Sequence, residues 1–88
     1  MEKFKILFPE KKSDMEDLFI KLASRLRHIL GDNLVSIESF AGPNGENVKI
    51  IVREKTWNVI DKVMEEVWRL EVEENIEGEI LPNMEESV

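Results

Sequence analysis

The 88-residue chain, with 42% hydrophobic and 35% charged side chains, has the composition of one small globular domain and not of a disordered segment. It contains no cysteine, which excludes disulfides, thiolate catalysis and cysteine metal sites, and its apolar runs are too short to cross a membrane. The net charge of −7 comes entirely from residues 45–88 and disfavours nonspecific binding of nucleic acid.

Composition also bounds the location and the extent of the domain. We expect a cytoplasmic protein, because Lys3 and Lys5 are followed by proline and charged residues in place of the apolar core of a signal peptide. Abundant Glu and Lys, with no Gln, favour a thermophilic source. Residues 1–82 are expected to form the single domain, and residues 83–88 a frayed C-terminal tail.

The chain begins with a predicted strand and a predicted helix. Apolar side chains alternate over Phe4–Phe8, and Pro9 ends this segment. Apolar residues at helical spacing then predict an amphipathic helix over Met15–Leu30. Gly31 follows at the position where many helices end in a left-handed residue.

A hairpin and a second helix form the middle of the chain. Leu34–Phe40 and Val48–Arg53 alternate in polarity around a turn that contains Asn-Gly, which is the usual chemistry of a hairpin. In the first strand we expect Val35 and Ile37 on one face. Thr56 is a predicted N-cap for a helix that runs from Trp57 to about Glu74.

The last predicted strand is Ile76–Ile80, which alternates again and is ended by Pro82. The element order is then β-α-β-β-α-β. Neither helix can bury its apolar stripe alone, so we expect an α+β two-layer sandwich with both helices on one face of a four-stranded sheet. Right-handed crossovers would make this sandwich ferredoxin-like.

Two groups of apolar residues are candidate interaction surfaces. Beyond its core stripe, the second helix carries a further apolar strip made of Trp57, Met64, Trp68 and Val72. This strip predicts either a contact for a protein partner or a second copy, or a roof over the edge of the sheet. The uncovered face of the sheet, a surface for sheet-to-sheet dimerisation, is expected to carry Leu7, Phe40, Ile51 and Leu81.

No residue pattern predicts catalysis. His28, the single histidine, has no serine at a spacing that would make it a general base. With Lys21 and Arg25 it could form a basic stripe for an anion, but cations near the end of a helix more often form a solvated face.

Metal and phosphate sites are not predicted either. The glutamates that follow position 70 lack the loop spacing of a calcium site and are read as solvated side chains: Glu71, Glu73, Glu74, Glu77 and Glu79. The turn Gly42–Gly45 could present backbone amides to an anion, but Pro43 removes one amide and no P-loop Lys-Ser/Thr follows. We predict no catalytic residue, no metal and no cofactor.

Residues 22–82 resemble a minimal nucleotidyltransferase domain. The resemblance is carried by Arg25–Ile37 followed by Phe40-Ala41-Gly42, by Ile50–Glu54 and the helix after it, and by Glu73–Pro82. It implies a phosphate-binding serine at Gly42 or Pro43, and a metal-binding Asp-x-Asp pair at about Asn47 and Lys49. A lysine repels the metal ion that a carboxylate would hold, so the resemblance implies a degenerate copy without transferase activity.

The leading hypothesis is therefore a non-catalytic protein-interaction or self-association module, with a homodimer or a protein partner. One alternative is a small-molecule-binding regulatory domain, which small α+β sandwiches often are. Another alternative is a degenerate nucleotidyltransferase-like domain that retains nucleotide binding.

Overall fold

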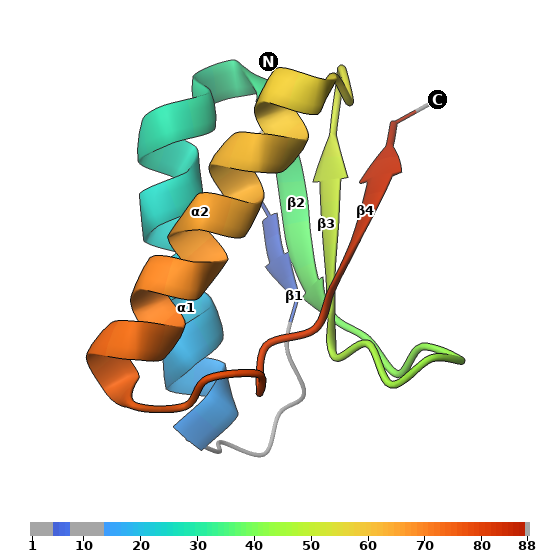
Figure 1. Ribbon diagram of the computed structural model, residues 1–88. Helices are drawn as coiled ribbons and strands as arrows, with labels where there is room; N and C mark the ends of the chain where they lie inside the picture. Colours follow the sequence, from blue (N-terminus) through green and yellow to red (C-terminus); the bar gives the residue numbers. More distant parts are fainter. Residues whose placement is uncertain (1–4, 8–13, 88) are drawn as a thin grey trace.

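The computed structural model describes residues 5–7 and 14–87 (Figure 1), with the backbone alone for residues 5–7, 14 and 15. Phe4, Phe8 and Pro9, which framed the first expected strand, lie outside these residues. The elements are β1 Lys5–Leu7, α1 Asp14–Leu30, the short 3-10 helix η1 Gly31–Asn33, β2 Leu34–Ser39, β3 Val48–Val52, α2 Trp57–Glu74 and β4 Pro82–Glu86.

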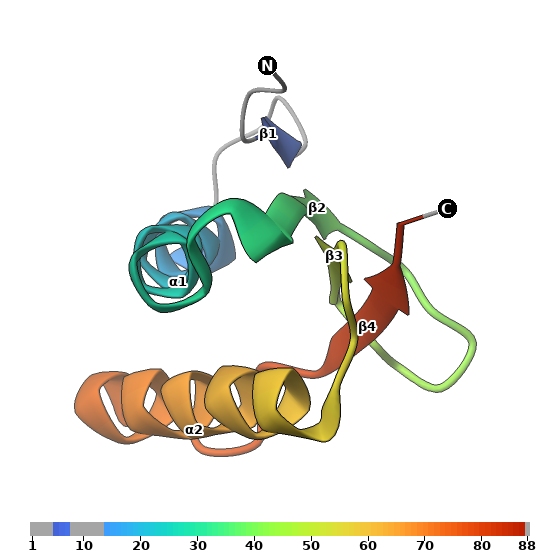
Figure 2. The same ribbon diagram turned by 90° about the horizontal axis from the view of Figure 1, so that it is seen from above.

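The strands form one sheet in the order β1-β2-β3-β4. β2 and β3 pair antiparallel, while the short β1 runs parallel to β2 and β4 runs parallel to β3. Figure 2 shows both helices on one side of this sheet. The predicted α+β class is confirmed.

The predicted ferredoxin-like strand order is wrong. In that arrangement the first strand is inserted between the third and the fourth. Here β4 pairs directly with β3, so that position is closed and β1 pairs along the free edge of β2. Each helix therefore connects two strands that are neighbours in the sheet.

The hairpin contains a β-bulge that the alternation did not predict. The register shifts between Leu34, which lies opposite Val52, and Ser36, which lies opposite Ile51. The extra residue, Val35, lets both Leu34 and Ile37 enter the core. The expected pairing of Val35 with Ile37 on one face is therefore wrong, and Leu34 takes the core position.

The ends of the helices follow their local sequence. The Thr56 hydroxyl accepts a hydrogen bond from the amide of Val59 at 3.2 Å, which confirms the predicted N-cap of α2. α2 ends at Asn75, in the left-handed region with φ 57°, and α1 ends before Gly31 at φ +56°.

The last strand lies later in the chain than predicted. The segment expected as a strand, Ile76–Ile80, is a loop with Gly78 at φ +83°, and β4 begins at Pro82. Proline is tolerated at the first residue of an edge strand, because no hydrogen bond from its nitrogen is needed there. Residues 83–86 thus belong to the sheet and not to a frayed tail. Met84 is the one buried residue of β4, so its apolar pattern is weak.

The core lies between the sheet and the two helices. Its fully enclosed side chains come from α1, from the hairpin and from α2: Leu22, Leu26, Ile37, Ile50, Leu70, Val48, Val52 and Val63. α2 contributes one face to this core, and the rest of its surface is available for other contacts.

Candidate functional site

Four large apolar side chains lie exposed along α2, and we call them the α2 strip: Trp57, Met64, Trp68 and Val72. The indoles of Trp57 and Trp68 are 81% and 62% exposed, and Met64 and Val72 are 40% and 44% exposed. The sequence left open whether these residues cover the edge of the sheet or face outward. At these exposures the two tryptophans face solvent.

The buried positions of α2 explain the direction of the strip. Val59, Val63, Val67 and Leu70 recur at helical spacing and enter the core. On a helical wheel with 3.6 residues per turn, the α2 strip is centred well away from this buried face. Whatever covers the strip must therefore come from outside the core.

Ion pairs also link α2 to α1. The Arg25 guanidinium donates two hydrogen bonds to the Glu73 carboxylate, at 2.6 and 2.8 Å, and Lys21 donates to Glu74 at 3.2 Å. The hydrogen bonds from Arg25 lower the pKa of Glu73, and the same contact raises the pKa of Arg25. Lys21 and Arg25, which we expected on a solvated face, thus bind the two glutamates at the end of α2.

Two carboxylates lie on the same side of α2 as the strip. Asp61 comes one helical turn after Trp57 and is exposed, and within the part of the chain that the structure describes it forms no ion pair. Glu65 lies one turn further on, and its carboxylate accepts from Arg69 at 2.8 Å. Sequence reasoning missed Asp61, although its spacing of four residues from Trp57 places it on the same face.

The second candidate surface, on the uncovered face of the sheet, is more polar than its apolar residues predicted. Phe40 and Ile51 are half-buried and Leu81 is 44% exposed, while only the backbone of Leu7 is described. Lys49 lies among them, with its ammonium 4.5 Å from the Phe40 ring centroid and 3.5 Å from the Glu85 carboxylate.

A carboxylate occupies the hairpin turn that could have presented amides to a phosphate. Glu46 Oε1 accepts a hydrogen bond from the backbone amide of Asn44 at 2.9 Å. Hydrogen bonds from this amide and from its own amide lower the pKa of Glu46. The carboxylate also fills the space beside Gly42, where a Cβ would collide with it. The turn therefore already holds an anion.

The two positions matched to an Asp-x-Asp pair have structural partners. The Asn47 side chain donates to the carbonyl of Glu79 at 2.7 Å and accepts from the amide of Leu81 at 2.9 Å. Lys49 pairs with Glu85, as above. Among the described residues, no group of three or more His, Asp or Glu side chains is arranged to hold a metal ion.

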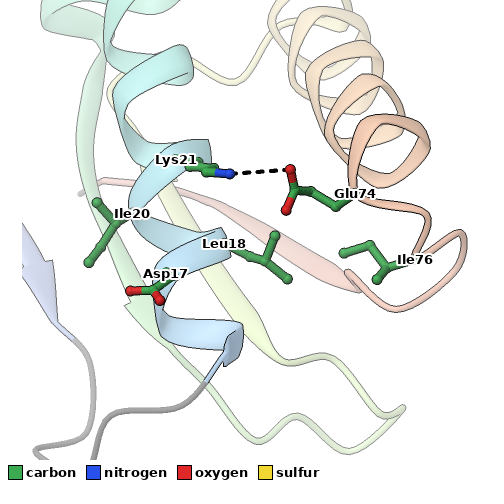
Figure 3. A pocket seen from close by; sticks show the side chains of 6 residues that line it. All are labelled: Asp17, Leu18, Ile20, Lys21, Glu74 and Ile76. Atoms are coloured by element: carbon green, nitrogen blue, oxygen red, sulfur yellow. Dashed lines mark hydrogen bonds and ion pairs between the residues drawn. The ribbon is translucent and has the colours of Figure 1, made fainter.

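A shallow depression of about 640 Å³ lies between the start of α1 and the end of α2. Figure 3 shows Lys21 and Glu74 joined by their ion pair across it, with Leu18 and Ile76 nearby. Sites for small molecules usually combine apolar walls with a few convergent polar groups. Here the lysine and the glutamate neutralise each other, so little charge is left to recognise a ligand.

One glutamate that we expected to be solvated is a structural residue. Glu71 is 7% exposed, and its carboxylate accepts a hydrogen bond from the backbone amide of Ile80 at 3.0 Å. Position 71 lies four residues after Val67, on the buried side of α2, which is the signal that could have identified it.

No helix in the described part of the chain combines the length and the apolar character that a membrane span requires. Comparison with protein-family models, with curated proteins and with solved structures gives no match for this chain.

Proposed function

We propose that this chain is a non-catalytic protein-interaction module and that its contact surface is the α2 strip. The exposure of two tryptophans on one helix face carries the proposal. Tryptophan buries a large apolar area when it is covered, and it is enriched among the residues that dominate binding energy at interfaces. Contiguous apolar patches on small proteins commonly mark such contacts.

The length of the strip supports a protein partner. From Trp57 to Val72 the strip rises along 15 residues of helix, which is about 22 Å at 1.5 Å per residue. A surface of this length matches four turns of a second helix. A small molecule would cover only part of it.

Tryptophan fluorescence tests the proposal without a label, because the chain has two tryptophans and no tyrosine. The free chain should emit as hydrated indole and be quenched readily by acrylamide. We expect a blue shift and protection from acrylamide either as the chain is concentrated or when an amphipathic helical peptide is added. Light scattering, run in parallel, separates self-association from peptide binding.

Matched variants locate the contact. Trp68→Ser should abolish the protection of Trp57, whereas Ile20→Ser, at an exposed apolar residue of α1, should leave it unchanged. The proposal fails if the indoles stay accessible under every condition. It also fails if Ile20→Ser removes the protection as completely as Trp68→Ser does.

We also propose that any relationship to nucleotidyltransferases is that of an inactive copy. Support comes from the order helix, strand, turn, strand, helix, strand over α1 to β4, and from the structural partners of Asn47 and Lys49. Calorimetric titration with Mg²⁺ and nucleoside triphosphates should give no heat of binding. Metal-dependent binding of a nucleotide would contradict this proposal.

A further inference from the structure

We infer that the occupant of the α2 strip is a helical segment of another protein that carries lysine or arginine, and not a second copy of this chain; this inference rests on the proposed function. It starts from Asp61, which lies within the strip and not at its rim. Together, Asp61 and the α2 strip form the series Trp57, Asp61, Met64, Trp68 and Val72.

The spacing of these positions favours a helical occupant. The first four follow one another at intervals of four, three and four residues, which is the spacing of the seam between two packed helices. A helix laid along α2 would cover the two indoles and Met64, and would bring one of its own side chains opposite Asp61.

The charge of Asp61 then selects the chemistry of that side chain. Asp61 forms no ion pair among residues 16–87, and the neighbouring Glu65 already binds Arg69. Covering a carboxylate without a cation is strongly unfavourable, because the charge loses its water and gains no partner. A lysine or arginine at the facing position supplies the opposite charge.

The surroundings of the strip act in the same direction. Residues 57–74 hold six acidic and two basic side chains, a net charge of −4 for α2. The field of the helix therefore attracts a basic segment and raises its rate of association at low salt.

A second copy of this chain supplies neither a cation opposite Asp61 nor an overall positive charge. In a parallel pair of copies the two Asp61 carboxylates would face each other, and in an antiparallel pair centred on the strip each would face the indole of Trp68. Neither arrangement supplies a cation. Each copy also carries a net charge of −7, so two copies repel each other at low ionic strength.

Two designed peptides test the inference. Both are 18-residue amphipathic helices, the length of α2, with leucine along one face. The lysine peptide has lysine beside that face, and the glutamate peptide has glutamate at the same positions. Affinity is read from the blue shift of the tryptophan emission and, independently, from the anisotropy of a dye on the peptide.

A charge reversal in the chain supplies the control. Asp61→Lys removes the carboxylate from the strip, and Glu77→Lys makes the same change of net charge at an exposed residue beyond α2. We expect the lysine peptide to bind the Asp61→Lys variant roughly tenfold more weakly than the unaltered chain. Glu77→Lys should weaken it far less, and Asp61→Lys should bind the glutamate peptide better than the unaltered chain does.

Each other outcome separates the inference from the proposed function. Equal affinity for the two peptides, or equal loss in the two variants, overturns the inference while the strip remains a contact surface. A dimer with protected indoles and no peptide binding does the same. If no peptide binds and the chain stays monomeric with accessible indoles, both the inference and the proposed function fail.

Discussion

Two asparagine side chains form hydrogen bonds with backbone groups that lie just outside the strands and helices. The side chain of Asn47 forms hydrogen bonds with the backbone of both Glu79 and Leu81. The side chain of Asn33 donates to the carbonyl of Glu54 at 3.0 Å and accepts from the amide of Glu54 at 2.8 Å. An amide group can do this because it donates and accepts at once. A carboxylate in place of Asn47 would keep the acceptor and lose the donor to Glu79.

Removing the Asn47 amide should destabilise the fold. Asn47→Ala removes two hydrogen bonds that are each worth about 0.5–1.5 kcal/mol, so we expect a loss of about 1–3 kcal/mol in the free energy of unfolding. Urea denaturation measures this loss, and hydrogen exchange should show faster opening at the amide of Leu81. Asn58→Ala, at an exposed position of α2, is the control and should change stability by about 0.5 kcal/mol or less. Equal losses in the two variants would contradict the structural role of Asn47.

The Arg25–Glu73 pair should make stability depend on pH. The pKa of Glu73 is lower in the folded chain than in the unfolded chain, so the pair stabilises the fold above the ordinary glutamate pKa. This contribution is lost as the pH falls through the folded-state pKa, where the carboxylate is protonated. The difference in melting temperature between the unaltered chain and Glu73→Gln should therefore be largest near neutral pH and vanish in acid.

Salt and a second variant separate this effect from general charge. Screening weakens exposed ion pairs, so high salt should shrink the difference between the unaltered chain and Glu73→Gln. Glu77→Gln removes a carboxylate that has no partner among residues 16–87, and it should show no such pH dependence. A constant difference across the pH range for Glu73→Gln would contradict the assignment.

At the scale of the elements, each helix has one face that is buried in the core and one face that is exposed to solvent. On α1, Leu22 is fully buried, while Ile20, two residues earlier, is 45% exposed. The first side chain belongs to the core cluster that also includes residues of the sheet and of α2. The second is exposed to solvent and lines the depression of Figure 3.

Truncating these two side chains should give very different results. Leu22→Ala opens a cavity in the core and should cost about 2–5 kcal/mol of unfolding free energy. That is a large share of the roughly 4–13 kcal/mol expected for a domain of this size. Ile20→Ala should cost much less, because water already reaches its side chain. Thermal denaturation measures the stability of both variants. A similar loss in the two would contradict the burial of Leu22, and not of Ile20, in the core.

At the scale of the whole molecule, local patterns predicted the elements better than their arrangement. Helical spacing and the Thr56 cap located α2 correctly, and alternation around Asn-Gly located the hairpin. The order of the strands was missed because it depends on which edge each crossover reaches, a property of long-range packing. β4 was missed because its burial rests on Met84 alone, and the bulge was missed because Val35 looks like a regular strand residue.

The candidate site divides in the same way. Helical spacing identified the α2 strip, because exposed and buried faces of one helix differ by a fixed rotation. The roles of Glu71 and Asn47 depend on the loop over residues 76–81, which lies close only once the chain has folded. The lone carboxylate of Asp61 became informative when its neighbour Glu65 was found bound to Arg69.

The hydrogen bond from Ile80 to the buried Glu71 has a mechanical consequence. It fastens the end of α2 to the residues that lead directly into β4, so the helix that carries the tryptophans is linked to the edge strand of the sheet. The amide of Ile76 donates to the carbonyl of Glu71 at 2.9 Å, so both the backbone and the carboxylate of Glu71 tie α2 to this loop. Glu71→Leu, which removes the acceptor of the Ile80 amide, should therefore loosen the path from α2 to β4 while the α2 strip stays exposed.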